Sequence, residues 1–325
     1  MTARMIPNFD PAAEAQSNDL SERYPGGAAG AWGLAPLNWG EFWSAEPPSE
    51  DWDMEPILPA GRQTSVFASA KVGKSLLALD GAAAKATGRS VFGQPAEEAA
   101  RVVYVDLEMT EVDLRERLTD MGYSRDDDLS KLAYYSLPSL PPLDTELGGD
   151  ILLDLAEGFG AKFCVIDTMA RAVSGDENLA DTYRAFYRHT GARLKAAGIG
   201  LLRLDHEGQD AARGPRGSSA KDDDPDLVFR LSTVDVTTLK LTRTRSRVPW
   251  VPAEVTLRRH EEPVRHVIVN GGSPAGTHAV VKVLDELKVP LDATADTALR
   301  ALKAAGQGRR KALVLAALKA RRERP

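Results

Sequence analysis

Residues 68–75 of the chain are Ala68-Ser69-Ala70-Lys71-Val72-Gly73-Lys74-Ser75. Before them, Thr64–Ala68 is an apolar run typical of a buried strand. After them, a pattern rich in Ala and Leu predicts a helix from Ser75 to Thr87, which Gly88 closes. Residues 68–75 therefore join a strand to a helix, as expected at the start of an α/β fold.

The chemistry of this loop indicates phosphate binding. Its backbone N–H groups can converge on an anion, and the helix N-terminus adds the positive end of its dipole. Gly73 lets the main chain approach closely, Lys74 can reach the β- and γ-phosphates of ATP, and the Ser75 hydroxyl can bind Mg²⁺. Ala68 stands where the first glycine of a Walker A motif is usual, and we expect its methyl group to fit. The loop is therefore predicted to be a P-loop that binds ATP and Mg²⁺.

The pattern continues outward from the loop as alternating strands and helices. Further strands are expected at Arg101–Asp106, Phe163–Asp167 and Ile199–Asp205, and helices at Glu111–Met121 and Asn178–Ala197. Several strands are too apolar for burial on one face only, which predicts a mostly parallel sheet flanked by helices. Beyond Asp226 the sheet is expected to end in antiparallel hairpins, with strands at Leu227–Leu231, Thr237–Leu241, Ala253–Leu257 and Val264–Val269.

Changes in composition divide the chain into four predicted parts. Residues 1–36 are acidic and poor in apolar anchors, so we expect disorder there. Residues 37–270 would form the α/β core, and the Gly-rich residues 271–276 a linker. Residues 277–325 would form a small basic helical module, with helices at His278–Leu287, Thr294–Ala305 and Arg309–Arg322.

Overall composition restricts the class of protein. The single cysteine, Cys164, excludes an intramolecular disulfide and a four-cysteine zinc site. Neither a membrane-spanning apolar run nor a secretion signal is visible, so we expect a cytoplasmic protein without a membrane partner. Residues 1–60 carry ten acidic and two basic side chains, whereas residues 297–325 carry nine basic and one acidic. A basic end on an acidic protein suggests a polyanionic partner, although a solvated helix face would give the same pattern.

Acidic side chains at two predicted strand ends are candidates for chemistry, because ligands bind at the carboxyl ends of strands in such sheets. Asp167 ends one apolar strand and is expected to organise the hydration shell of Mg²⁺. Asp106 and Glu108 follow another strand, and either could activate the water that attacks the γ-phosphate.

Together these motifs resemble the RecA-like hexameric P-loop ATPases, specifically the replicative helicases of the RepA and DnaB types. The resemblance covers roughly residues 52–257 and implies a RecA-like core and a homo-oligomeric ring, which is a hexamer in that family. Leu107-Glu108-Met109 resembles the catalytic-glutamate motif of that family, which favours Glu108 over Asp106. His206, after the fourth strand, matches the position of the γ-phosphate sensor.

The resemblance also assigns two basic segments. The Gly-rich residues 207–221 look like the loop that faces DNA in the central channel, and Arg213, Arg216 and Lys221 suit contact with a phosphate backbone. The acids at 222–224 depart from that pattern and would repel a nearby strand. Residues 242–247 resemble the basic finger that reaches a neighbour's γ-phosphate, with Arg245 as first candidate and Arg243 as second.

The sequence leaves three functional hypotheses. The leading one is an ATPase that hydrolyses ATP and acts on single-stranded DNA as a helicase-type motor. The alternative is a DNA-binding regulator whose assembly ATP switches, with residues 277–325 as a helix-turn-helix-like module. A small-molecule P-loop kinase is less well supported, because it needs an arginine-rich lid over the phosphates.

Overall fold

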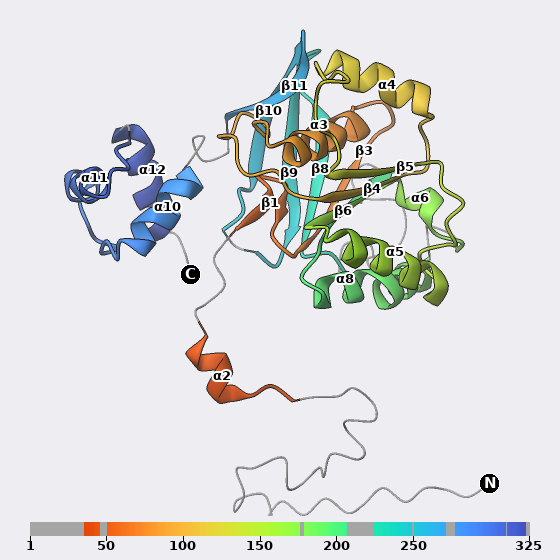
Figure 1. The fold of residues 1–325 in the computed structure, drawn as a ribbon, viewed down its shortest axis with the longest axis horizontal. Helices are drawn as coiled ribbons and strands as arrows, with labels where there is room; N and C mark the ends of the chain where they lie inside the picture. The colour runs from red at the N-terminus through yellow and green to blue at the C-terminus, as the bar shows by residue number, and fades with distance from the viewer. Residues whose placement is uncertain are drawn as a thin grey trace, which may run out of the picture. The chain divides into compact units, whose positions relative to one another are not determined.

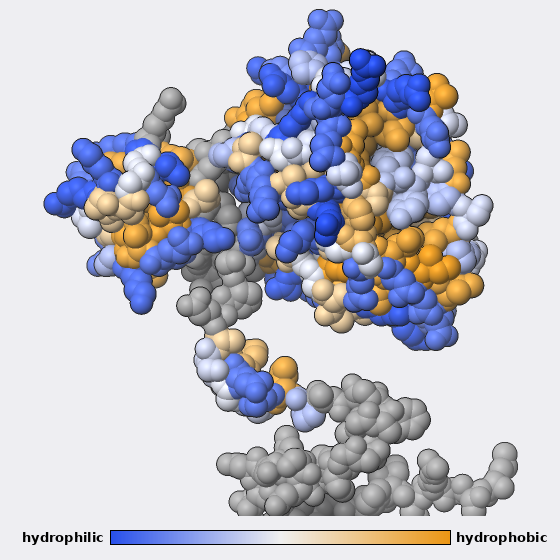
Figure 2. All heavy atoms as spheres, viewed as in Figure 1, coloured by the Kyte–Doolittle hydropathy of each residue, from blue (hydrophilic) through white to orange (hydrophobic). Residues whose placement is uncertain are grey.

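A computed structural model describes residues 36–45, 51–175, 179–206, 224–248, 250–270, 277–309 and 311–322 of the chain. Its backbone contacts divide the chain into two units, Met1–Ser49 and Glu50–Pro325. The described part of the first unit contains helix α2 (Trp39–Ser44). The side chain of its N-cap residue, Asn38, accepts hydrogen bonds from the backbone N–H groups of Gly40 and Glu41. The aromatic side chains of this helix, Trp39, Phe42 and Trp43, are exposed, and Figure 2 shows both hydrophilic and hydrophobic residues on the surface of α2.

The second unit is built on a nine-stranded sheet with the order β11-β10-β9-β8-β3-β7-β6-β4-β5 (Figure 1). Six strands run parallel: β3 (Gln63–Ala68), β4 (Val102–Asp106), β5 (Leu132–Ser136), β6 (Phe163–Asp167), β7 (Gly200–His206) and β8 (Leu227–Thr233). Antiparallel pairing then adds β9 (Thr238–Ser246), β10 (Glu254–Glu261) and β11 (Val264–Asn270). A separate pair is formed by β1 (Trp52–Met54) and β2 (Leu58–Pro59).

Helices cover both faces of the parallel part, because its strands alternate apolar side chains between two cores. Along β4, Val102 and Tyr104 join the core beneath α3 (Lys74–Thr87) and α4 (Glu111–Asp120). Val103 and Val105 join the opposite core. That core lies beneath α5 (Glu146–Phe159), α6 (Met169–Ala172), α7 (Ala180–Phe186), a π-helical turn (Tyr187–Gly191) and α8 (Ala192–Ala196). Figure 1 shows α3 on one side of the sheet, with α5 and α8 on the other.

The predicted α/β class is confirmed, with corrections to several elements. Strand β5 and helix α5 were not predicted, because β5 is only half-buried and α5 carries two glycines in its first turn. The second, Gly149, packs so closely on the carbonyl of His189 that a Cβ would lie 1.9 Å from it. The helix predicted up to Ala197 is interrupted by the π-helical turn. Strand β9 continues to Ser246, beyond the predicted end at Leu241. Residues 242–245 alternate Thr with Arg rather than polar with apolar residues, so the hydrophobic pattern did not mark them as a strand.

The three helices predicted after residue 276 are present as α10 (Thr277–Glu286), α11 (Ala295–Ala304) and α12 (Lys311–Arg322). They share a core of their own, which includes Leu284, Leu302 and Leu318. Arg321 pairs with Asp285 at 2.7 Å and donates to a backbone carbonyl, and Arg322 donates to two more. Two basic residues of the C-terminal segment therefore hold this module together. Within the described residues, every helix is too short or too polar to cross a lipid bilayer.

Candidate nucleotide-binding site

The predicted phosphate loop connects the end of β3 to the first turn of α3. Its backbone takes left-handed conformations at Lys71, with φ 64°, and at Gly73, with φ 105°. A Cβ at Gly73 would meet no atom within 4 Å, so the glycine is required by backbone conformation rather than by space. Helix α3 begins at Lys74, one residue earlier than predicted, and the nearly buried Lys74 Nζ lies 3.4 Å from the carbonyl oxygen of Ala68. The ammonium group is thereby held inside the loop.

Ala68 itself replaces a glycine without a steric conflict. It is the last residue of β3, is fully buried, and its methyl group belongs to the hydrophobic core beneath α3. The side chain therefore points away from the phosphate position. Of the eight loop residues, the cleft is lined by Ala70, Lys71, Gly73, Lys74 and Ser75.

Asp167 and Ser75 meet at the carboxyl edge of the sheet. Ser75 Oγ donates to Asp167 Oδ1 at 3.0 Å, and Tyr104 OH donates to Asp167 Oδ2 at 2.9 Å. Burial raises the pKa of Asp167 to about 6, helped by the negative charges of Asp106 and Glu108, while the two hydroxyl donors oppose the rise. A hydroxyl and a buried carboxylate at this distance are oxygen ligands that Mg²⁺ prefers, and the cation would relieve the burial of the charge. The residues present therefore fit the predicted magnesium site.

The surroundings of Asp106 favour Glu108 as the candidate for the catalytic base. Its side chain is fully buried and its Oδ1 accepts the backbone N–H groups of Glu108 and Met109 at 2.8 and 2.9 Å. Its Oδ2 accepts the hydroxyl of Tyr134, whose ring stacks on Tyr104. With both oxygens engaged, Asp106 shapes the turn after β4 and cannot face a water molecule in the cleft.

Glu108 follows on that turn and lines the cleft with its side chain about one-third exposed. Its Oε1 accepts Thr168 Oγ1 at 3.3 Å and Arg171 Nε at 3.1 Å. His206 Nε2 lies 3.9 Å from the same oxygen. The structure thus brings the predicted catalytic and sensor residues together across three strands. Thr168 and Arg171 were not predicted, although Thr168 directly follows the predicted metal ligand.

The comparisons with known proteins agree with this geometry. A family model described as an AAA domain matches residues 34–212, more than half of the chain.

The chain belongs to the AAA domain family.

Among solved structures, the AAA domain chain is similar to a KaiC-like protein of the hyperthermophilic archaeon Pyrococcus horikoshii. The match covers 68% of this chain and 97% of that one, with 14% sequence identity and a TM-score of 0.50. At this identity the likeness shows the fold alone, which is the RecA-like α/β fold. No curated protein matches the sequence.

The two finger candidates of this AAA domain protein differ in their surroundings. The pairing of β8 with β9 shifts register between Val228 and Phe229, so that Arg245 faces Val228 and Arg243 faces Phe229. Arg243 donates to the carbonyl groups of Val248 and Val251 and thereby holds the turn after β9. Arg245 is exposed and donates to the carbonyl group of the adjacent Thr244 at 3.1 Å. The geometry therefore favours Arg245 as the side chain able to reach another molecule.

Arg245 is also distant from the phosphate loop of its own chain. Its register partner Val228 pairs with Ser65, three residues before the end of β3. Arg245 therefore lies about 10 Å across the sheet and about 10 Å along it from Ala68, given ordinary strand spacing and rise. Neither Arg243 nor Arg245 lines the cleft. The candidate DNA contacts Arg213, Arg216 and Lys221 lie outside the described residues.

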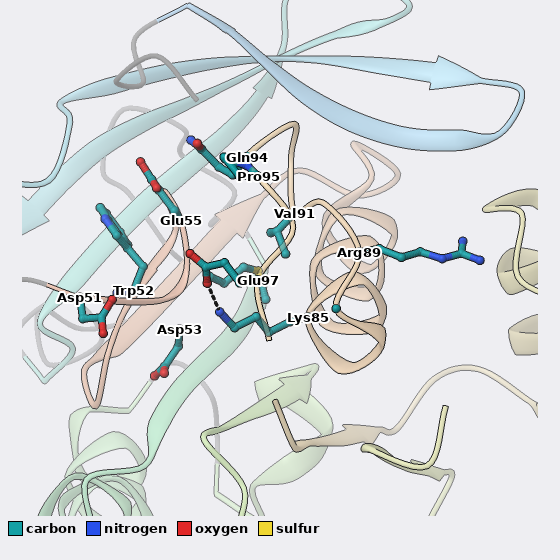
Figure 3. A pocket seen from close by; sticks show the side chains of 12 residues that line it. Asp51, Trp52, Asp53, Glu55, Lys85, Arg89, Val91, Gln94, Pro95 and Glu97 are labelled. Atoms are coloured by element: carbon teal, nitrogen blue, oxygen red, sulfur yellow. Dashed lines mark hydrogen bonds and ion pairs between the residues drawn. The ribbon is translucent and has the colours of Figure 1, made fainter. Parts of the chain in front are cut away.

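A second hollow lies beside the C-terminal half of α3, and Figure 3 shows it from close by. Acidic side chains dominate its lining, Lys85 is paired with Glu97 at 2.7 Å, and Arg89 points away. Burial raises the pKa of its Asp53 to about 7, against the opposing effect of the Gly61 N–H group and two lysines. The phosphate loop does not line this hollow, so the cleft at the carboxyl edge remains the candidate nucleotide site.

Proposed function

We propose that this protein hydrolyses ATP with Mg²⁺ and uses the energy to move along or remodel single-stranded DNA as a ring-shaped homo-oligomer, a motor of the replicative-helicase type. Membership of the AAA domain family and the RecA-like fold support the ATPase part. The DNA substrate and the ring are the further steps of the proposal.

In the proposed mechanism each side chain at the carboxyl edge has one task. Lys74 and the loop N–H groups bind the phosphates, while Ser75 and Asp167 hold Mg²⁺, which neutralises developing charge on the phosphate oxygens when bound. Glu108 accepts a proton from the attacking water. His206 senses the loss of the γ-phosphate.

The observation that carries the proposal is the position of His206 between the cleft and the candidate DNA-binding segment. His206 is the last residue of β7 and approaches Glu108, and residues 207–221 with their three basic side chains follow directly. A shift of His206 on hydrolysis would therefore move the segment that follows it.

Arg245 supports an oligomer. Arg245 is exposed and its backbone lies away from its own phosphate loop, so in this proposal it acts on the nucleotide of a neighbouring copy. A closed ring repeats such a heterologous contact at every interface.

The test is steady-state ATP hydrolysis by the full chain with and without single-stranded DNA, beside Lys74→Ala. We expect turnover that rises with DNA and is lost in the variant, because Lys74 is the ammonium held inside the loop. ATP binding without turnover, or turnover indifferent to DNA, would contradict the motor.

A second candidate function is a DNA-binding regulator that ATP switches, and the separate core of α10–α12 favours it. Of the basic side chains on this module, Arg321 is buried, whereas several others are exposed, among them Arg300, Lys303, Arg309 and Lys311. It predicts that the full chain shifts duplex DNA and that a chain ending at residue 270 does not. Equal shifts by the two chains would exclude the module as the duplex-binding part.

A further inference from the structure

Arg171 stands at the candidate active site without a role in the mechanism above. It lies on the four-residue helix α6, just after Asp167 and Thr168, and its Nε donates to Glu108 Oε1 at 3.1 Å. Its side chain is 62% exposed. An ion pair this open to solvent contributes little to folding, so its contact with Glu108 calls for another explanation.

Both partners of this ion pair stand on fixed backbone. On one side, helix α6 is anchored by Met169, which is fully buried, and by the Ala172 carbonyl, which accepts the Leu143 N–H group at 2.7 Å. On the other side, Asp106 holds the backbone of Glu108, and the preceding Leu107 N–H group donates to the Asp167 carbonyl at 2.7 Å. The pair is therefore set by the ends of β4 and β6 rather than by two flexible loops.

The hydrogen bonds to Glu108 are uneven between its two oxygens. Arg171 and Thr168 both donate to Oε1, the oxygen that His206 also approaches. Among the described residues, Oε2 takes part in none of the hydrogen bonds or ion pairs found for this carboxylate. A general base needs one oxygen to accept the proton of water, and fixing the other oxygen sets the direction of that acceptor.

We propose that Arg171 is a positioning residue for hydrolysis, whose guanidinium group fixes Glu108 Oε1 so that Oε2 is presented to the attacking water. This inference rests on the proposed ATPase function and assigns Arg171 no contact with the nucleotide. Thr168 adds a weaker, neutral hold on the same oxygen.

The kinetic test compares kcat and KM for ATP among the wild type, Arg171→Ala and Arg171→Lys, measured with the full chain and single-stranded DNA. Arg171→Ala is expected to lower kcat about 10-fold, a part of what a general base contributes, and to leave KM within about twofold. Arg171→Lys should retain an intermediate kcat, since lysine keeps the charge but not the planar fork. Arg184→Ala is a matched control, because the Arg184 side chain is about as exposed as that of Arg171 and forms a 3.1 Å pair with Asp181 away from the cleft.

Coupling to Glu108 separates positioning from an independent effect. Under single-turnover conditions, Arg171→Ala should lower the rate no further in a chain that already carries Glu108→Gln. A further 10-fold loss in that background, an unchanged kcat of Arg171→Ala in the native background, or a raised KM alone would each overturn the inference. Thermal melting checks that each variant is folded, and Arg171→Lys carries the comparison if the alanine variant is not.

The failure of this inference differs from the failure of the proposed function. A wild-type protein that binds ATP but does not hydrolyse it overturns both. A wild-type protein that hydrolyses ATP, beside an Arg171→Ala variant of equal kcat, overturns the role of Arg171 alone.

Discussion

The two ends of the parallel strands carry charged groups of the same kinds but in different arrangements. At the carboxyl ends, Lys74, Glu108 and Asp167 converge on one cleft beside the N-terminus of α3. Toward the amino ends, Asp53 is buried against Gly61, and Arg245 is exposed opposite Val228. One end therefore assembles a cis site within a single chain, whereas we propose that Arg245 acts on a neighbouring copy. On this proposal the complete ATPase site would be divided between two copies.

Arg245→Ala tests the divided site most severely. We expect ATP turnover to fall about 10³-fold with ATP binding retained, because the variant removes transition-state stabilisation and leaves the cis site intact. Arg243→Ala should instead lower the free energy of unfolding by about 1–2 kcal/mol, since it releases the carbonyl groups that Arg243 holds. Turnover and urea denaturation of the two variants measure the difference. The assignment is wrong if Arg243→Ala loses turnover and Arg245→Ala does not.

Several residues at the carboxyl ends of the strands could be predicted from the sequence, because the patterns that mark these strands are local. Apolar runs mark β3, β6 and β7, and the rule that ligands bind at strand ends then places Asp167 near the loop, while the family resemblance supplies His206. The family resemblance already favours Glu108 over Asp106, and the structure adds a physical reason in the bond from Tyr134 of β5, a strand with too weak a pattern to be predicted.

Arg171 and the finger candidates show what local patterns omit. Arg171 lies on a helix of four residues, which is too short for any periodicity. The alternation of Arg243 and Arg245 suggests equivalent positions, but the register shift beside Val228 gives them different partners. Such pairings depend on a neighbouring strand, so a single stretch of sequence does not contain them.

Mixing two inactive variants tests whether Arg245 acts on the nucleotide of a neighbouring subunit. In an equimolar mixture of Lys74→Ala and Arg245→Ala, an active site forms where an Arg245→Ala subunit with an intact loop meets a Lys74→Ala subunit with an intact finger. Random assembly gives this order at one interface in four, so we expect about a quarter of wild-type turnover. Turnover is measured after the subunits have exchanged. A mixture as inactive as its components would show that Arg245 serves its own chain or none.

The smallest expected effect is on folding stability and concerns two buried aspartates, Asp167 and Asp53. Burial raises their pKa values to about 6 and about 7. The folded state holds these protons up to a higher pH than the unfolded state. Stability is therefore lost as pH rises from about 4 through the folded pKa, and the loss is complete above it. Asp167→Asn and Asp53→Asn should each raise the free energy of unfolding at pH 8, by on the order of 1–3 kcal/mol, and give little gain at pH 4.

Function should separate these two variants where stability does not. Asp53→Asn is expected to keep ATP turnover, because Asp53 lies near the amino ends of the strands against Gly61. Asp167→Asn should lose it, because its carboxylate meets Ser75 at the magnesium position. Urea denaturation at the two pH values, beside turnover at pH 8, makes the measurement. Equal turnover in the two variants would mean that the Asp167 carboxylate has a structural role. The folding stability that is lost by burying this charge would then not serve to bind a cation.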